Sequence, residues 1–451
     1  MHLNDTIAAI ATAPGPAGVC VVRISGPEAL QVADRLIPLT SHKPSRRAAG
    51  TFFYADICHP VTNEKIDDAL ILIFHAPRSF TGEEVVEIQG HGGTLPSQRL
   101  LDAVLAAGAR LAESGEFSKR AFLNGRLDLT QAEAICDYIQ SKSERMAHAA
   151  RAQVDGALGS RVTALYEAML AHCADIEHQL DFDEGELSET FLLETTQALQ
   201  QTMLPLARMI QSWNTQGHVL RDGALVVLSG KPNAGKSSLL NALLGRNRAI
   251  VHHVPGTTRD VIEETLLVEG IPLRLADTAG LRLATDDVEQ EGIARTRDLM
   301  KQADINLHLV DGATATDEEL AALPQDARSI TVLTKSDLPR VAAGNPRHLD
   351  EPIQVSAQTG AGLDRLTQAI LIKLGVVNAS AGLEIINQRH AQELRTAYTA
   401  AEQAQALLLQ RDLVIAANEL RASAEALGRI VGRVYSADLL ESIFSRFCVG
   451  K

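Results

Sequence analysis

The first part of the chain alternates short apolar runs with turn residues. The runs at 18–24, 69–74 and 85–88 have the length and the β-branched content of buried strands. At 96–107 the apolar residues instead recur every three or four positions, which is typical of an amphipathic helix. Residues 1–118 are therefore expected to form a small α+β or α/β domain.

The pattern changes to helical spacing after residue 118. Between 119 and 216, Gly and Pro are scarce and Ala, Leu, Gln, Glu and Arg dominate, and the same texture returns at 377–451. Both stretches predict long amphipathic helices that pack as a bundle. We expect them to share one core, because neither looks self-sufficient.

Between these stretches, the chain alternates strand-like and helix-like segments. Apolar runs predict strands at 225–228, 261–268, 271–275, 305–310, 330–333 and 353–355, and a helix at 236–244. This order indicates an α/β domain inserted into a helical one. The predicted organisation is therefore 1–118, 119–216, 217–376 and 377–451.

Charge and composition narrow the class of protein. With 42 basic and 56 acidic residues, the chain of 451 residues has a formal net charge of −14. Such a field repels polyanions and argues against wholesale coating of nucleic acid or an anionic membrane, but it does not exclude a local basic site. No apolar run is long enough to span a membrane, and residues 1–22 lack the basic start of a secretory signal. Five scattered cysteines without ligand spacing fit reduced thiols, so we expect a cytoplasmic protein without a membrane segment.

A phosphate-binding motif stands between the predicted strand at 225–228 and the helix that follows it. Residues 230–237 read Gly-Lys-Pro-Asn-Ala-Gly-Lys-Ser, which matches the pattern GxxxxGK[ST] in the strand-to-helix context that the motif requires. Glycines let backbone N–H groups surround the phosphates, and Lys236 can reach the β- and γ-phosphates. The Ser237 hydroxyl can bind Mg²⁺. The motif predicts a nucleoside triphosphate site.

Further motifs follow in the order that a GTPase requires. They are a Thr-Thr pair at 257–258, a DxxG at 277–280, a TKxD at 334–337 and a Ser-Ala-Gln loop at 356–358. Asp337 can accept hydrogen bonds from the N1–H and amino group of guanine, whereas adenine lacks this arrangement of donors. Thr334 replaces the usual Asn, which should keep a hydrogen-bonding side chain but soften the affinity for guanine. The predicted nucleotide contacts are Asn233, Ala234, Gly235, Lys236, Ser237, Ser238, His252, His253, Val254, Pro255, Gly256, Thr257, Thr258, Asp277, Thr278, Ala279, Gly280, Thr334, Lys335, Asp337, Ser356, Ala357 and Gln358.

The usual water-positioning group is missing from this set. In Ras-like proteins a glutamine directly after the DxxG glycine orients the attacking water, and here that position is Leu281. Arg259 and Arg282 are conceivable arginine fingers, but a surface salt bridge is the better interpretation of each.

Another route to hydrolysis is open to the sequence. Asn233 lies inside the phosphate loop, where its side-chain oxygen can hold a monovalent cation if the loop at 251–258 closes over it. A K⁺ ion there would neutralise charge on the β- and γ-oxygens as an arginine would. Glu289 can orient water, although it belongs to an acidic run that by itself indicates a solvated face. The predicted catalytic residues are Glu289, Asn233 and Lys236.

Segments outside the nucleotide motifs point to a family. They lie at 5–9, 23–26, 79–84, 89–93, 115–118, 120–129 and 447–451. With these segments in this order, the chain resembles the MnmE (TrmE) family of tRNA modification GTPases over its whole length.

The resemblance implies a fold and a function. The fold would combine an N-terminal α/β folate-binding and dimerisation domain, a helical-bundle domain and an inserted Ras-like P-loop G domain. The function would be that of a homodimeric GTPase that K⁺ activates through G-domain dimerisation. Its partner would be the FAD-dependent protein MnmG, in a heterotetramer that adds a carboxymethylaminomethyl or aminomethyl group to C5 of the wobble uridine of certain tRNAs. The one-carbon unit would come from 5-formyl- or 5,10-methylene-tetrahydrofolate.

The resemblance also implies roles for residues. Asn233 matches the K⁺ ligand, and His252, Val254 and Thr257 fall in the K⁺-binding loop. Ser237 and Thr258 match the Mg²⁺ ligands, and Glu289 falls on the water-orienting glutamate.

Four further positions fall on folate contacts, namely Arg23, Glu87, Arg126 and Lys451. Glu87 can accept hydrogen bonds from the amino edge of a pterin, and the cations can meet glutamyl carboxylates. Position 126 is Lys or Arg in the family, and Arg binds a carboxylate through two donors where Lys acts as a point charge.

Two alternatives remain open. Cys448 can be a reactive thiolate, if Arg446 and Lys451 lie close enough to lower its pKa, or a residue that packs the C-terminal tail, which we favour. The chain as a whole can be a regulatory G-protein switch or assembly factor with no part in tRNA chemistry. The folate-type residues separate these functions, because a pure switch needs no one-carbon carrier.

Overall fold

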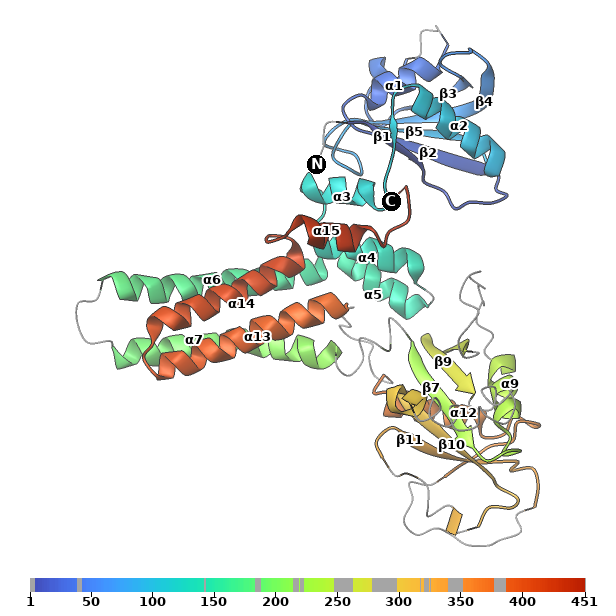
Figure 1. Ribbon diagram of the computed structural model, residues 1–451, viewed down its shortest axis with the longest axis vertical. Helices are drawn as coiled ribbons and strands as arrows, with labels where there is room; N and C mark the ends of the chain where they lie inside the picture. The colour runs from blue at the N-terminus through green and yellow to red at the C-terminus, as the bar shows by residue number, and fades with distance from the viewer. Residues whose placement is uncertain are drawn as a thin grey trace, which may run out of the picture. The chain divides into compact units, whose positions relative to one another are not determined.

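The protein forms two compact units in the computed structural model (Figure 1). The first comprises Met1–Cys136, Val154–Tyr166 and Leu427–Lys451, and the second comprises Asp137–Gln153 and Glu167–Ala426. The described residues are 5–38, 43–141, 143–182, 188–213, 219, 223–246, 263–277, 298–316, 318–319, 324, 326–339, 352–376 and 387–450, with only the backbone at 181, 182, 263 and 277. The four-segment organisation stays a prediction.

The first unit contains a six-stranded sheet in the order β3-β4-β5-β2-β1-β6. Its strands are β1 (Ile7–Ile10), β2 (Val19–Ser25), β3 (Phe52–Cys58), β4 (Lys65–Phe74), β5 (Val85–His91) and β6 (Arg110–Leu111). Neighbouring strands are antiparallel except for the parallel pair β1 and β6. The three strands predicted for this part of the chain fall within β2, β4 and β5, and the mixed sheet makes it α+β.

The two faces of this sheet carry different side chains. On one face, helices α1 (Ala29–Leu36) and α2 (Thr94–Ala106) pack against Val22, Ile24 and Ile88, which are fully buried. Because successive residues of a strand point to opposite faces, Arg23 and Glu87 lie on the other face. A short 3-10 turn, η1 (Pro44–Arg46), follows α1.

Helices from distant parts of the sequence complete the first unit. These are α3 (Glu116–Leu123), the start of α4 (Leu129–Gln140) and α15 (Ala437–Phe444), which share an apolar cluster that includes Phe122, Leu129, Leu440 and Phe444. The C-terminal tail then pairs with the N-terminal part, because Val449 forms a β-bridge with Ser114. A Cβ atom on Gly450 would lie 2.4 Å from the carbonyl oxygen of Ile10, so the tail fits there only as glycine.

A buried cation ties the start of the chain to α3. Arg120 is only 2% exposed. Its guanidinium donates to the backbone and carboxylate oxygens of Asp5, at 2.8 and 2.5 Å, and to Glu83 at 3.2 Å. A charge so far from water is stable only when it is paired in this way.

Long helices form a bundle in the second unit. They are α6 (Ala157–Phe182), α7 (Glu189–Ser212), α13 (Gln388–Leu409) and α14 (Leu413–Val431), of which α6 and α14 extend into the first unit, and α5 (Glu144–Val154) precedes them. The Ser423 hydroxyl donates to the Ala397 carbonyl at 2.8 Å, and the Cys173 thiol to the Ala417 carbonyl at 3.4 Å. Such short side chains let the helices approach closely, and Ala397, Ala401 and Ala404 of α13 are fully buried. The predicted shared core of the two helical stretches is therefore confirmed.

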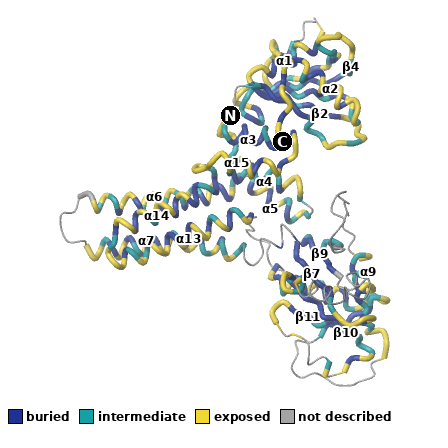
Figure 2. Tube along the Cα trace, in the orientation of Figure 1, coloured by how far each residue is buried: buried dark blue, intermediate teal, exposed yellow. Residues whose placement is uncertain are grey.

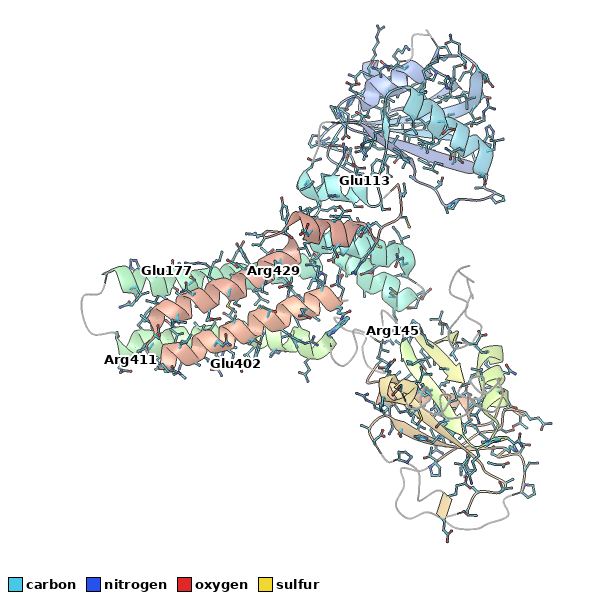
Figure 3. The ribbon with its side chains drawn as sticks, viewed as in Figure 1. Glu113, Arg145, Glu177, Glu402, Arg411 and Arg429 are labelled. Atoms are coloured by element: carbon cyan, nitrogen blue, oxygen red, sulfur yellow. The ribbon has the colours of Figure 1, made fainter. Side chains whose placement is uncertain are left out.

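Ion pairs lie on the outside of this bundle. Glu177 of α6, labelled in Figure 3, pairs with Arg421 of α14. Arg411, in the turn between α13 and α14, pairs with Glu189 at the start of α7. All these side chains are about half exposed or more, so the pairs contribute little to stability, and the buried alanine and leucine face holds the bundle together.

The second unit also contains a six-stranded sheet, in the order β12-β11-β10-β7-β9-β8. Its strands are β7 (Ala224–Gly230), β8 (Glu263–Val268), β9 (Ile271–Asp277), β10 (Ile305–Asp311), β11 (Ser329–Thr334) and β12 (Ile353–Gln354). All neighbours are parallel except β8 and β9. Figure 2 shows its central strands as buried, and helices α9 (Lys236–Arg246) and α12 (Leu363–Lys373) pack into its largest apolar cluster. The predicted strand–helix alternation is confirmed wherever the structure describes it.

None of the described helices is long and apolar enough to cross a membrane. The cysteines Cys20, Cys58, Cys136, Cys173 and Cys448 are free thiols.

Candidate functional sites

The phosphate loop connects the carboxyl end of β7 to α9. Gly230 has φ of 150°, and a Cβ there would lie 2.4 Å from the Leu309 carbonyl oxygen, so only glycine lets the loop leave the sheet at this point. Lys236 opens α9, is 7% exposed, and donates from Nζ to the carbonyls of Gly230 at 2.8 Å and Lys231 at 2.9 Å. The ammonium therefore lies across the loop, beside the N–H groups at the start of a helix. This arrangement suits a phosphate.

Asn233 stands out within this loop. Its φ of 64° is left-handed, a conformation that asparagine tolerates better than most residues. Its side chain is exposed, and no hydrogen bond joins its amide to any other residue that the structure describes. The side-chain oxygen is thus available to a cation, whereas the other expected K⁺ ligands, His252, Val254 and Thr257, lie outside the described residues.

Thr334 ties the phosphate loop to the end of β11. Its hydroxyl, 4% exposed, lies 2.8 Å from the Ala234 carbonyl and 3.1 Å from that of Val310. A hydroxyl has one proton, and both neighbours are acceptors, so that proton is engaged inside the protein. Thr334, which replaces the usual asparagine, therefore stabilises the phosphate loop through the Ala234 carbonyl.

The other described base-site residues gather at the same edge of the sheet. Lys335 follows β11 with φ of 56°, and its Nζ lies 2.6 Å from Asp311 Oδ2, a hydrogen bond that holds the pKa of Asp311 below its usual value. Ser356 is fully buried, and its hydroxyl accepts from the Thr359 N–H at 3.2 Å. Asp337 is exposed. Asp311 was not among the predicted site residues, although its place at the end of a parallel strand is a usable signal.

Part of the predicted nucleotide site lies outside the described residues. This holds for His252, His253, Val254, Pro255, Gly256, Thr257, Thr258, Thr278, Ala279, Gly280 and Glu289, and for the side chain of Asp277. The backbone of Asp277 ends β9 directly opposite Leu228 of β7, so the DxxG segment begins at the same sheet edge as the phosphate loop.

A second candidate site lies on the face of the first unit's sheet opposite α1 and α2, where Phe117 of α3 packs against Ile7 and Ala9. Arg23 of β2 and Glu87 of β5 sit opposite each other in register, and Arg23 Nε donates to Glu87 Oε1 at 2.9 Å. Their side chains are only 18% and 17% exposed. The guanidinium carbon lies 5.0 Å from the ring centre of Phe80 and 5.7 Å from that of Phe117. The pair is therefore partly dehydrated and bordered by aromatic faces.

Arg126 joins this site through a turn. Its Nε donates to the Ser79 carbonyl at 3.2 Å, next to Phe80 in the chain, and a Cβ on Gly82 would lie 3.1 Å from Arg126 Cγ. Three of the four folate-type residues thus meet around one turn, and Lys451 lies outside the described residues. Phe80, which is partly exposed, was not among the predicted site residues although it stands in a motif that carries the family resemblance, whereas Phe117 is fully buried in an apolar cluster with Ile7 and Ala9.

These residues fit a flat, anionic heterocyclic ligand. Aromatic faces stack on planar rings, a carboxylate accepts from ring amino groups, and Arg126 is a bidentate donor for carboxylates. The Cys448 thiol is exposed, and its carbonyl accepts from the Gly115 N–H at 3.4 Å, so the backbone of this residue fixes the tail.

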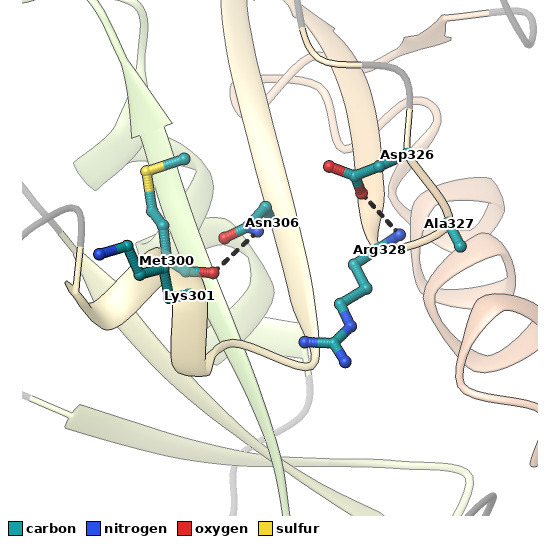
Figure 4. A pocket seen from close by; sticks show the side chains of 6 residues that line it. All are labelled: Met300, Lys301, Asn306, Asp326, Ala327 and Arg328. Carbon is teal, nitrogen blue, oxygen red and sulfur yellow. Dashed lines mark hydrogen bonds between the residues drawn. The ribbon is translucent and has the colours of Figure 1, made fainter.

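A cavity of about 460 Å³ lies at the opposite edge of the second sheet (Figure 4). Its lining consists of Met300, Lys301, Asn306, Asp326, Ala327 and Arg328. Asn306 donates to the Met300 carbonyl at 3.1 Å, and the Arg328 N–H donates to Asp326 at 2.8 Å. The cavity lies at the amino ends of β10 and β11, whereas the phosphate loop follows a carboxyl end, so the cavity is separate from the nucleotide site.

Comparisons with known proteins identify the family of the chain. The family model "GTP-binding protein TrmE N-terminus" matches residues 6–126, and the model "MnmE helical domain" matches residues 129–448. A tRNA modification GTPase MnmE from Geobacter metallireducens is 41% identical over 465 residues, covering 100% of both chains. The protein of the same name from Dichelobacter nodosus is 42% identical over 466 residues, again with 100% of each chain covered. Among solved structures, the G domain of the T. maritima FeoB iron transporter is 26% identical, with a TM-score of 0.24, and covers 33% of this chain and 98% of its own.

Proposed function

The chain belongs to the MnmE family of tRNA modification GTPases, and on that premise we propose that it hydrolyses GTP during modification of the wobble uridine of certain tRNAs. The phosphate loop binds the triphosphate, with Lys236 moving from the Gly230 and Lys231 carbonyls to phosphate oxygens. Asp337 reads guanine. Ser237 and Thr258 hold Mg²⁺, which supplies charge neutralisation at the β- and γ-oxygens.

Hydrolysis in this proposal depends on K⁺. The accessible side-chain oxygen of Asn233, together with the loop that carries His252, Val254 and Thr257, holds the ion where it offsets charge on the phosphates. Glu289 orients the attacking water, since Leu281 cannot. Two copies of the chain bring their G domains together in the GTP-bound state.

The N-terminal site binds a tetrahydrofolate that carries a one-carbon unit. Glu87 accepts from the pterin amino edge, the partly exposed ring of Phe80 borders the heterocycle, and Arg126 with Lys451 meets the glutamyl carboxylates. The partner is an MnmG-type FAD protein in a heterotetramer, which supplies the redox chemistry. The product carries a carboxymethylaminomethyl or aminomethyl group at C5 of the uridine.

One observation carries the proposal: the partly buried Arg23–Glu87 pair lies beside two aromatic rings in the same chain as the phosphate loop. The alternative function, a regulatory switch or assembly factor, would need the phosphate loop. It would have no use for the Arg23–Glu87 pair.

The test of the GTPase part compares hydrolysis by the purified chain in K⁺ and in Na⁺ buffers at equal ionic strength. We expect strong stimulation by K⁺ that is lost in Asn233→Ala. Equal, slow rates in the two salts would contradict the proposed role of Asn233.

A further inference from the structure

The second sheet has one apolar face and one face interrupted by polar side chains. Toward the largest apolar cluster, alternate residues of three adjacent strands are buried, namely Val226, Leu228, Leu307, Leu309, Ile330 and Val332. On the opposite face, Ser229 of β7 is the register partner of His308 of β10, and Ser329 of β11, which pairs with Asn306, lies diagonally from His308. Polar groups in such a place persist only if they are hydrogen-bonded.

The three side chains form a continuous string. Ser229 Oγ of β7 lies 2.8 Å from His308 Nδ1 of β10. His308 Nε2 lies 3.2 Å from Ser329 Oγ of β11. His308 is 6% exposed and Ser329 is 8% exposed, so the bond between them is shielded from water, and the bond to the half-buried Ser229 is partly shielded.

Asp326 fixes the direction of this string. Although burial raises the pKa of Asp326, hydrogen bonds from the Arg328 N–H and from Ser329 hold it below its usual value, so the carboxylate is ionised and can only accept. The Ser329 hydroxyl therefore donates to Asp326 and accepts from His308 Nε2–H. Nδ1 of the same ring is then the acceptor for the Ser229 hydroxyl. Burial lowers the pKa of His308, which favours the neutral ring that this pattern requires.

The string ends at the phosphate loop. Ser229 directly precedes Gly230, whose carbonyl accepts from Lys236 Nζ at 2.8 Å. The Ser229 hydroxyl also lies within 3.3 Å of the Leu307 carbonyl, so without His308 it can turn its proton to that neighbour. The His308 ring thus determines the orientation of the Ser229 hydroxyl, directly before the chain enters the phosphate loop at Gly230.

We propose that His308 is a positioning residue for nucleotide binding, acting through Ser229 on the phosphate loop. The inference rests on the proposed function only in that the loop binds a guanine nucleotide. It adds that the side chain of His308, on the sheet face opposite α9, affects the affinity for the nucleotide.

The test measures the affinity of the full chain for N-methylanthraniloyl-GDP by fluorescence, alongside thermal unfolding of each variant. His308→Leu should weaken binding about fivefold, the usual effect of losing one hydrogen bond. Asn306→Leu is the matched control, because Asn306 lies on the same face of the same strand but donates to the Met300 carbonyl at 3.1 Å, away from the loop. It should leave the affinity within about twofold of wild type while also lowering stability.

Two further variants separate positioning from general loss of structure. Ser229→Ala should weaken binding as much as His308→Leu does, and the double variant should be no weaker than either alone, because both break one link. His308→Gln, which keeps a donor and an acceptor, should restore part of the affinity.

Each result has a defined meaning. If wild type binds the probe, an unchanged affinity in His308→Leu would overturn the inference. Equal losses of affinity in His308→Leu and Asn306→Leu would overturn it as well. Failure of wild type itself to bind the probe would instead overturn the proposed nucleotide site.

Discussion

The two candidate sites are built from different parts of their sheets. In the second unit, the groups that we propose to bind the nucleotide gather at the carboxyl edge of a mostly parallel sheet, among them Lys236, which bonds to the phosphate-loop backbone. In the first unit, Arg23 and Glu87 project from the face of neighbouring antiparallel strands. An edge site depends on loop conformation, whereas a face site depends on strand register and on which residues alternate outward.

The difference predicts that each site can be disabled without the other. Because we propose that the Lys236 ammonium binds the phosphates directly, Lys236→Ala should lower kcat/KM for GTP at least about 100-fold, the usual effect of removing a donor from a charged transition state. Binding of 5-formyl-tetrahydrofolate should not change. Steady-state hydrolysis and calorimetric titration measure the two effects.

Lys231→Ala is the control for that change. Lys231 lies in the same loop, but its side chain is 76% exposed and pairs with Glu319 at 2.9 Å. Its loss should cost little, and a large effect there would mean that general charge in the loop, rather than the position of Lys236, determines the rate.

The converse variant acts on the face site. Glu87→Gln removes a charged acceptor and should weaken binding of 5-formyl-tetrahydrofolate about tenfold, or ~1.4 kcal/mol, without changing GTP hydrolysis. Glu64→Gln, at an exposed pair with Arg99 in the same unit, should leave both activities intact. A fall in GTP hydrolysis in Glu87→Gln would show that the two sites are not independent.

Thr334 sharpens the comparison within the edge site. Thr334→Val removes the hydroxyl that bonds to the Ala234 carbonyl at 2.8 Å, and should weaken GTP binding about fivefold. Because the hydroxyl supports the loop, GTP and 7-deaza-GTP should be affected equally, and Thr334→Ser should restore both. A change in their ratio would instead place residue 334 in contact with the base.

The smallest expected effect is on the pH dependence of stability. It concerns two histidines whose pKa values shift in opposite directions. In the first unit, hydrogen bonds to the Arg47 carbonyl and to Glu84 raise the pKa of His75, whereas burial lowers that of His308 in the second. A raised pKa contributes stability that is present below the unfolded value of about 6.5 and lost as pH rises through the folded value. A lowered pKa contributes stability above about 6.5 that is lost as pH falls.

Thermal unfolding across this pH range checks both signs. The stability advantage of wild type over His75→Gln should be greatest in acid and shrink toward alkaline pH. The advantage over His308→Gln should change in the opposite direction. Parallel pH profiles for the two variants would contradict the assigned environments.

Residue spacing alone could predict more of the edge site than of the face site, for a physical reason. The phosphate loop needs glycines and Lys236 at fixed spacing within one turn, so its residues are contiguous and form a motif. Arg23 and Glu87 are 64 positions apart and meet only through strand pairing, and family resemblance alone indicated them. Phe80 was not identified because no spacing rule links a ring in a turn to a cation on a strand.

The fold shows the same distinction between features that local spacing reveals and features that depend on pairing between distant residues. Helical periodicity predicted the bundle and its shared core, because contacts between long amphipathic helices repeat along the chain. The four-residue strand β1, the edge strand β3 and the two-residue strand β6 were not predicted, since short or half-exposed strands carry little apolar signal. The buried string through His308 could not be read either, because a lone polar residue in an apolar run does not reveal its cross-strand partners.

The most direct test of the account is calorimetric titration of the full-length wild-type chain with 5-formyl-tetrahydrofolate, in the absence of nucleotide. We predict saturable binding that Glu87→Gln weakens and Lys236→Ala leaves unchanged. No binding at millimolar ligand would contradict the face site and favour a G-protein switch without a role in one-carbon chemistry.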